Sequence, residues 1–390
     1  MYLAALTRSL SMREKIKLRP LIPWFLCLVG WPLLLFFVPL QDALVQLVGL
    51  RGNVFFLPFL LVGAMMNGAD IRRVAKALVW LNAIALIFAL AETVFGVQRF
   101  YSVANPVNLG IFRSSDVYFA GKAHYRIPAT FVSSAEYASA MIASVPLLLG
   151  ALGQEARGTI WRHLLFAAVG ASAVGVFLAG SRSSVVVLLI MGASIMLPGR
   201  VRNVPRGALI ALVIGVGVIV AFTPRMQRFV TLEDSSYVTK RLHSSMNESF
   251  LSLAIDYPLG NGLGGGGTSL PYFLQERLTN PIGLENEYAR ILAEQGIPGL
   301  VLWMAFIVWL LTRPAARTSD PTYRGKSLAR LFCFICFATA PIGIGMLDAI
   351  PGTEMLLLLA GWFAAQEPIR AAAPVLRPVP QTVFKAGAHA

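Results

Sequence analysis

The sequence has 390 residues, of which 56% are hydrophobic and only 13% are charged, and its formal net charge is +14. Soluble domains carry about 25% charged residues, so a chain of this composition could not cover a water-facing surface of its size. A soluble protein is therefore excluded, and we expect an all-α, polytopic membrane protein. The positive charge does not indicate a nucleic-acid partner, because no basic run is interleaved with stacking aromatic side chains.

Apolar stretches near the length of about 20 residues that crosses a bilayer recur along the chain. They predict about ten transmembrane helices, of which the second and the last are short; a re-entrant or tilted piece over residues 41–52 is left open. The first stretch, Leu21–Leu40, is too long for a signal-peptide core, so we expect it to be a span. The predicted spans cover residues 22–40, 53–67, 77–95, 135–152, 163–180, 183–198, 207–223, 288–312, 330–347 and 353–366.

Basic residues set the expected orientation. They gather in residues 1–21 and then in alternate short loops, which places both termini in the cytoplasm. Two long loops, at about 96–134 and 224–287, then lie outside, and their aromatic residues favour folded loops. The expected regions are a basic N-terminus, a transmembrane domain over 22–366 that includes both loops, and a disordered cytoplasmic tail over 367–390, rich in Ala and Pro.

Two arginines are candidate anion ligands, and the first stands where a charge is costly unless it is paired or faces a wet cavity. Arg182 lies between two apolar spans, within Gly180-Ser181-Arg182-Ser183-Ser184. It either snorkels to lipid headgroups or binds an anion. Arg241 lies in the second long loop, where a surface helix would put it on one face with Glu248. That pair is either a solvated ion pair of small value or part of a site.

A Gly-rich stretch runs from Asp256 to Gly267. By letter it fits G-x-G-x-x-G, but neither the strand before it nor the helix after it that the dinucleotide fingerprint requires is expected. We expect a tight backbone turn instead. Its N–H groups, including those of Gly262 and Gly264, could cradle an oxyanion.

A polar string from Glu285 to Gln295 marks the point where the second long loop enters a span. Arg290 and Glu294 are four residues apart, so they can pair on one helix face. The segment Gly296-Ile297-Pro298-Gly299 is expected to kink the helix just beyond. Spacing alone leaves open whether the string is an interfacial cap or part of an active site.

In their order along the chain, these motifs resemble the O-antigen ligase and polymerase family of bacterial envelope glycosyltransferases. The family's ligases carry His-Asn, nine residues and Gly-x-x-Gly at the end of the large periplasmic loop. Here nine residues separate Asn286 from Gly296, and Gly299 follows. The resemblance covers roughly residues 120–310. Three further matches are Ser181-Arg182 at the outer end of a span, Arg241 about 15 residues before Asp256-Tyr257-Pro258-Leu259-Gly260-Asn261-Gly262, and Arg126-Ile127-Pro128-Ala129-Thr130-Phe131 for Arg-x-x-Gly-Thr-Phe.

One departure concerns the ligase histidine, which is replaced here by Glu285. A carboxylate at a membrane edge tends to have a raised pKa, which suits a general base. The replacement is easier to reconcile with a polymerase than with a ligase.

The resemblance implies a glycosyltransferase of the bacterial inner membrane, with a catalytic domain that moves glycan from a polyprenyl-diphosphate carrier to an acceptor hydroxyl on the periplasmic face. It would either polymerise O-antigen or exopolysaccharide repeats or ligate a finished O-antigen to a lipid core in lipopolysaccharide biosynthesis. Glu285 would act as base, and Arg182 and Arg241 would bind the diphosphate. The expected substrate-binding residues are Asn286, Tyr288, Arg126, Gly262 and Gly264.

The expected partners are the lipid-linked glycan donor, the glycan or lipid-core acceptor and membrane lipids. The donor is already activated, so no cofactor is implied, and the absence of a D-x-D motif or metal-ligand cluster implies no metal. Two other classes stay open: a transporter of polysaccharide or lipid-linked glycan, and a non-catalytic assembly protein. A transporter would favour polar groups deep in several spans and internal repeats, and neither is evident.

Overall fold

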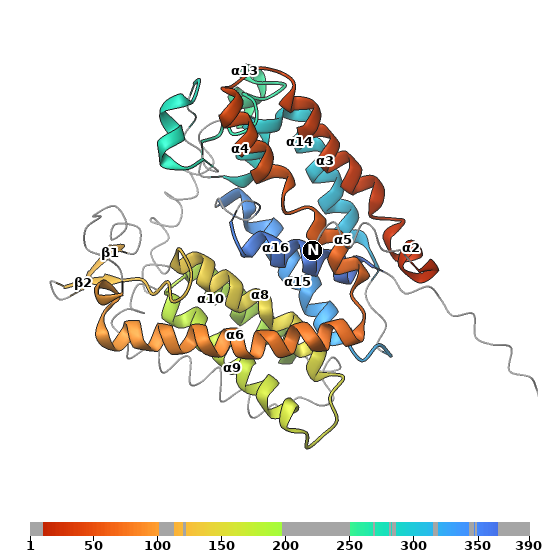
Figure 1. The fold of residues 1–390 in the computed structure, drawn as a ribbon, viewed down its shortest axis with the longest axis vertical. Coiled ribbons are helices and arrows are strands. Elements are labelled where there is room, and N and C mark those ends of the chain that lie inside the picture. Colours follow the sequence, from red (N-terminus) through yellow and green to blue (C-terminus); the bar gives the residue numbers. More distant parts are fainter. Residues whose placement is uncertain are drawn as a thin grey trace, which may run out of the picture.

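The computed structural model describes residues 11–100, 113–119, 122–196, 250–267, 270–280, 282, 286–314, 319–342, 347 and 349–365. Figure 1 shows a bundle of helices with one small hairpin at its edge. The elements are α2 (Met12–Leu18), α3 (Ile22–Phe36), α4 (Ala43–Val54), α5 (Pro58–Met65), α6 (Gly68–Phe95), η1 (Val97–Arg99), β1 (Arg113–Phe119), β2 (Lys122–Tyr125), α8 (Ser134–Leu152), α9 (Ile160–Ala179), α10 (Arg182–Met196), α13 (Phe250–Asp256), η3 (Tyr272–Arg277), α14 (Glu287–Thr312), α15 (Tyr323–Thr339), η4 (Ala340–Ile342) and α16 (Gly352–Ala364).

Several helices are long and apolar enough to cross a bilayer, so the prediction of a helical multi-pass membrane protein is confirmed. In the described part of the chain five stretches meet this criterion: Ala43–Met65, α6, α8, α9 and α14. Shorter apolar helices include α3 and α16. Every predicted span within the described residues overlaps a helix. The span at 207–223 lies outside them, and the count of about ten and the orientation remain predictions.

The second predicted span was placed too late in the sequence. Helix begins at Ala43 rather than at residue 53, as α4, and continues after a short turn as α5. The cause is the polarity of α4, in which Gln46 and Asn53 lower the local hydropathy although both side chains are buried. Gln46 donates to the nearby carbonyls of Val38 and Gln41, whereas Asn53 bonds side chains of α14 far away in the sequence, which local hydropathy does not reveal.

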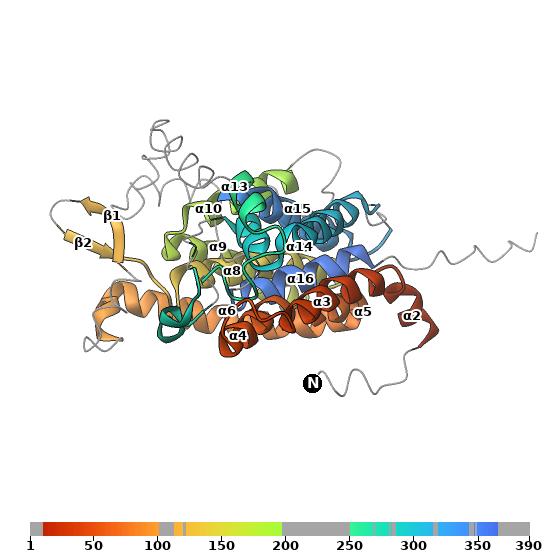
Figure 2. The same cartoon turned by 90° about the horizontal axis from the view of Figure 1, so that it is seen from above.

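The helices form two groups, and further helices pack between these groups and join them. Helices α6, α8, α9 and α10 pack on one another, and α3 packs on α4 and α14. Between these groups α16 packs on both α5 and α8, and α15 packs on α8 and α10 (Figures 1 and 2). Glycines bring α5 and α16 close, because a Cβ on Gly63 or Gly361 would collide with the carbonyl of Leu358 or Leu60. Small residues at such contacts are typical of helices packed in a membrane.

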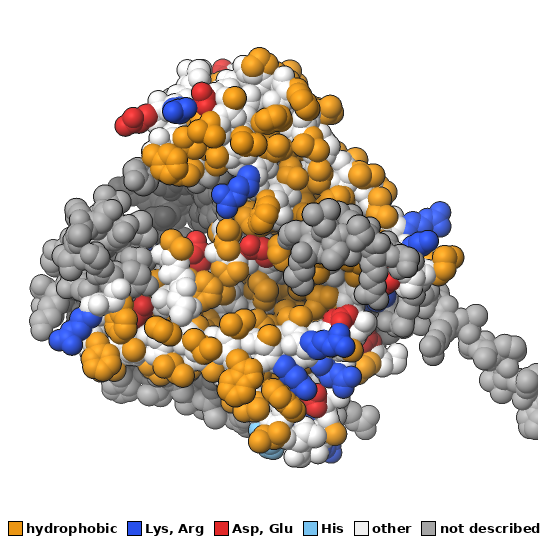
Figure 3. Space-filling model, viewed as in Figure 1, with side chains coloured by type: hydrophobic (Ala, Val, Ile, Leu, Met, Phe, Trp, Pro, Cys, Tyr) orange, Lys and Arg blue, Asp and Glu red, His pale blue; other side chains and the backbone are white. Residues whose placement is uncertain are grey.

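Burial differs sharply between the helices of the first group. In the most apolar windows of these helices, 78% of residues are buried in α8 but only 28% in α6. Helix α8 is therefore the centre of the bundle, and α6 presents a long hydrophobic face outward (Figure 3). A polar contact ties them together, since Asn82 donates to Ser144 (2.8 Å) and Ser172 (2.9 Å) in α8 and α9. Such interhelical bonds contribute up to about 1–2 kcal/mol in membranes.

A two-stranded antiparallel hairpin of β1 and β2 lies within the first long loop. The sequence predicted a folded loop but not a strand there. Figures 1 and 2 show the hairpin projecting beside the end of α6, away from the packed helices. The helical description of the membrane-embedded part is unaffected.

Candidate active site

Asn286 fixes the start of α14. Its side-chain Oδ1 accepts hydrogen bonds from the backbone N–H groups of Tyr288 (2.9 Å) and Ala289 (3.2 Å). This is an N-cap, which satisfies two donors that the first turn of a helix leaves unpaired. The same residue was predicted to bind substrate, and that role remains a prediction.

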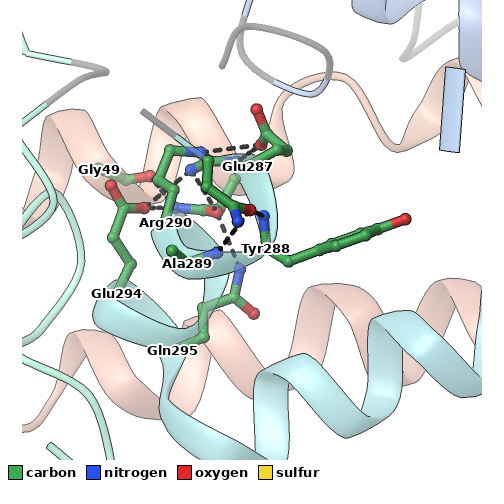
Figure 4. Close-up of polar contacts among 9 residues, drawn as sticks. Gly49, Glu287, Tyr288, Ala289, Arg290, Glu294 and Gln295 are labelled. Carbon is green, nitrogen blue, oxygen red and sulfur yellow. Dashed lines mark hydrogen bonds and ion pairs between the residues drawn. The ribbon is translucent and has the colours of Figure 1, made fainter. Parts of the chain in front are cut away.

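The first two turns of α14 bury three charged side chains on one face. Arg290 is only 1% exposed, and Glu287 and Glu294 are not exposed at all. Arg290 donates to Oε1 of Glu287 from Nη2 (2.6 Å) and Nε (2.9 Å), and from Nη1 to Oε2 of Glu294 (3.0 Å) (Figure 4). The predicted pairing of Arg290 with Glu294 is therefore confirmed. The cluster is wholly buried, unlike a cap at the membrane interface.

Asn53, from α4, completes this cluster. Its Nδ2 donates to Glu294 (2.7 Å) and to the carbonyl of Gly49 (2.9 Å). Its Oδ1 accepts from Arg290 (3.3 Å) and from Nε2 of Gln295 (2.8 Å). We call Asn53, Glu287, Arg290, Glu294 and Gln295 the α4–α14 network. Because both ends of the Asn53 amide are used, the network fixes one helix against the other.

The predicted kink in α14 is a break at Gly296, where φ is +69° and ψ is −172°. In an unbroken helix the N–H of Ile297 would bond the carbonyl of Ala293. Here Ile297 donates to Pro258 (2.9 Å), and Ala293 accepts from the N–H of Asn261 (2.6 Å). The N–H of Ile297 and the carbonyl of Ala293, which would bond each other in an unbroken helix, thus both bond the Gly-rich loop instead.

The Gly-rich loop is a tight turn, as predicted, and it packs against α4 and α14. Gly265 and Gly267 donate to the carbonyls of Gly262 and Gly264, at 2.9 Å each. Gly262 and Gly264 have φ of +88° and +78°, and both are buried. A Cβ at either would come within 2.8 Å of α4 or of the residues just before it. Close packing therefore accounts for glycine here, and anion binding by these residues remains a prediction.

Tyr288 is anchored away from the network. Its hydroxyl donates to the carbonyl of Phe337 in α15 (2.6 Å), and the side chain is buried. This bond joins the start of α14 to the end of α15. A role for Tyr288 in positioning the acceptor remains a prediction.

Arg182 is the first residue of α10, directly after the turn that ends α9. Gly180 makes that turn in the left-handed region (φ +66°), and Ser181 and Ser184 share a hydrogen bond of 2.9 Å. The Arg182 side chain, Arg241 and Glu285 lie outside the described residues. The structure therefore gives no contact for the three predicted catalytic side chains.

Arg126 is half-buried in the segment that leads from β2 into α8. Three residues later, Ala129 has a φ of +51°, which non-glycine residues rarely adopt, and its N–H donates to the buried Glu92 (2.9 Å). In the resembled Arg-x-x-Gly-Thr-Phe motif a glycine stands at this position. Ala129 thus adopts the positive φ that the glycine of the motif would adopt more easily.

Three residues of the site were missed in the sequence: Asn53, Gln41 and Glu92. Gln41 donates to Asn261 (2.8 Å) and accepts from the N–H of Thr279 (2.9 Å), so it also anchors the Gly-rich loop. Each is a polar residue in or beside an apolar stretch, which is the signal that could have revealed them.

The region that holds these motifs matches a known family. Residues 166–304, about a third of the chain, match the family model described as O-antigen ligase. Over these residues the chain is similar to the O-antigen ligase family. The predicted resemblance is confirmed, and the match includes Arg182, the second long loop and α14 as far as residue 304. No curated protein matches the sequence closely enough to be compared with it.

The match supports an O-antigen ligase-type function in the assembly of envelope polysaccharide. It is consistent with an enzyme of the glycosyltransferase type. At a coarse level it implies a lipid-linked glycan and a lipid A–core as substrates.

Proposed function

We propose that this O-antigen ligase-family protein transfers a glycan from a polyprenyl-diphosphate carrier to an acceptor hydroxyl at the outer face of a bacterial inner membrane. The observation that supports this most directly is the anchored start of α14. Asn286 caps the helix, and the buried α4–α14 network holds the next two turns in place. The residue immediately before Asn286 would therefore have its side chain held close to a rigid helix, and catalysis requires such fixed positioning.

Glu285 is the residue at that position, and we assign it the role of general base. Of the neighbouring carboxylates, Glu287 and Glu294 already contact Arg290 and are fully buried. Both carboxylates are therefore occupied by the Arg290 guanidinium and have no exposed surface at which an acceptor hydroxyl could approach. Glu285 is thus the carboxylate of this segment best suited to take the proton of an acceptor hydroxyl.

Arg182 and Arg241 are assigned to the diphosphate. Arg290 is a poor candidate for that role, since it lies between two carboxylates that offset its charge. Guanidinium groups bind phosphate oxygens in a bidentate manner and stabilise charge on the leaving group. In the proposed step the acceptor oxygen bonds to the anomeric carbon, the bond from that carbon to the phosphate oxygen breaks, and the diphosphate leaves with the electron pair. A single in-line displacement inverts the anomeric centre.

The arrangement of the helix groups supports a donor bound between them. Arg182 begins α10 in one group, whereas the anchored α14 belongs to the other. A lipid-linked sugar lying between the two groups would have access to residues of both.

The function is tested by reconstitution. Purified protein in liposomes is given a diphosphate-linked oligosaccharide alone, and the products are separated by size. A ladder of repeats identifies a polymerase, and a single transfer that requires an added lipid core identifies a ligase. If labelled donor is neither consumed nor transferred under either condition, the proposed activity is wrong; movement of intact donor between leaflets would then favour a transporter.

We predict that Arg182→Ala and Arg241→Ala each abolish product while the protein still inserts normally, because each removes a contact to the leaving diphosphate. Lysine at either position should rescue poorly, since the bidentate fork is lost. Product formation is measured in the same liposomes, with membrane insertion as the control. Wild-type turnover in either alanine variant would remove that arginine from the leaving-group assignment.

For the base, we predict that Glu285→Gln is inactive, because an amide cannot accept the proton. Glu285→His should retain some activity, since imidazole can serve as a base. The measurement is the pH dependence of transfer, which should shift toward higher pH in the histidine variant. An active glutamine variant would move the base to His243 or Glu287, of which Glu287 is already bonded to Arg290.

A further inference from the structure

A basic depression, open to the surface and called the cavity below, lies at the beginning of α6, far along the chain from the proposed transfer site. It has a volume of about 250 Å³ and is lined by Ala69, Arg72, Arg73 and Lys76. The lining positions are spaced 3, 4 and 7 residues apart, so they form a single stripe on the helix. Figure 3 shows Lys and Arg side chains gathered over this end of α6.

Charge in the cavity is only partly balanced. Arg73 contacts Asp70 at 3.3 Å, in a pair whose arginine side chain is 80% exposed. Lys76 lies 4.4 Å above the ring of Trp161 in the first turn of α9. Cations this close together repel one another, and an anion between them relieves the repulsion. Asn67 and Asp70 already cap the first N–H groups of α6, so the cavity's attraction for anions comes from its side chains.

The same stripe continues as an exposed apolar surface. Trp80, Ile84 and Ile87 are 60%, 48% and 65% exposed. From Lys76 to Ile87 the stripe extends about 16 Å at 1.5 Å per residue, close to half of a hydrocarbon core of about 30 Å. One molecule with an anionic head and an acyl chain as long as one leaflet is deep would cover the stripe from end to end. The excess of Lys and Arg in cytoplasmic loops explains why cations lie at this end of α6. It does not explain why these cations are aligned with an apolar stripe that faces outward.

We propose that this face of α6 binds an anionic phospholipid, with its phosphodiester headgroup between Arg72 and Lys76 and an acyl chain along Trp80, Ile84 and Ile87. The chemistry of the headgroup site is that of a phosphate bound by guanidinium and ammonium groups. A cavity of about 250 Å³ is large enough for a hydrated phosphate, since a water molecule occupies about 30 Å³ in the liquid. Trp161 lies beside the headgroup, a position typical of indole rings at the membrane surface.

The test compares two variants that remove the same charge. Arg72→Gln/Lys76→Gln alters the cavity, and Lys15→Gln/Arg19→Gln removes two exposed cations at the same i,i+4 spacing from the end of α2. Native mass spectrometry of the full-length protein in detergent measures binding of phosphatidylglycerol, with phosphatidylcholine as the zwitterionic probe. The cavity variant should bind phosphatidylglycerol roughly thirty-fold more weakly, because it loses two basic residues that each strengthen binding to an anionic headgroup. The α2 variant should bind it like the wild type.

Two further measurements make the outcome decisive. Inorganic phosphate in excess should leave the bound lipid in place, because it lacks the chain; displacement by phosphate would assign the site to a free anion instead. Brominated phosphatidylglycerol should quench Trp161 fluorescence, obtained as the difference from Trp161→Phe, more than brominated phosphatidylcholine at equal mole fraction. Equal quenching by the two lipids, or equal losses in both variants, would overturn the proposal.

Discussion

Arg290 is surrounded by two carboxylates and an amide within the membrane-embedded bundle, at 1% exposure. Burying charges is costly, so a buried ion pair adds little net stability, but removal of one partner leaves the other charge poorly compensated. The value of such a network is that it fixes one geometry. At the scale of single residues, we therefore expect that neutralising Glu287, Arg290 and Glu294 together lowers stability less than removing Arg290 alone.

We predict that Arg290→Met lowers stability by about 3–5 kcal/mol, because Glu287 and Glu294 lose the cation that both contact. Adding Glu287→Gln and Glu294→Gln should recover a substantial part of that loss. Unfolding of the purified protein in detergent measures both. The control is Arg73→Met, which breaks an exposed pair worth no more than about 1 kcal/mol. Equal melting of Arg290→Met and the wild type would mean that the network does not hold α14.

At the scale of elements, α14 consists of two helical segments separated at Gly296, and the Gly-rich loop occupies the gap. Ile297 and Ala293 exchange their mutual helical bond for bonds to Pro258 and Asn261. The break is therefore a docking point for the loop and loses no backbone hydrogen bond at these two groups.

We predict that Gly296→Ala destabilises the protein and lowers transfer. Its φ and ψ lie in a region that is essentially glycine-only, where strain costs about 1–3 kcal/mol, and a Cβ would also collide with the backbone of Leu259. Gly170→Ala is the matched control, because it lies inside α9 with no atom within 4 Å of the added Cβ. That variant should be unchanged or more stable. Melting temperature and turnover are measured together, and a harmless Gly296→Ala would mean that the loop is not held by the break.

At the scale of the whole molecule, the direction of α6 relates the basic cavity to the predicted active site. Its first turns carry the basic residues, and its end leads to the hairpin loop. The expected orientation places these two ends on opposite sides of the membrane. The donor would then react on one face while the anionic lipid binds at the other.

We predict that a cysteine at Arg99 reacts with a membrane-impermeant maleimide added from outside, whereas one at Ala156 reacts only after the membrane is opened. Both positions are exposed, at the end of α6 and in the turn between α8 and α9. The variants are made on a Cys27→Ser/Cys336→Ser background, because Cys27 is exposed and Cys336 is half-buried, while Cys333 is buried. Labelling of both positions from outside would contradict the predicted orientation.

The sequence by itself determined the membrane class, most of the helices, the break at Gly296 and the order of the family motifs. These depend on composition, on local apolarity and on residues close together in the chain. Only the tertiary structure decided that α4 is helical with one face buried, that Asn53 bonds Glu294 from 241 positions away, and that the Gly-rich loop completes α14. A polar residue in an apolar segment reveals that a partner is needed, but the partner is chosen by packing between distant segments.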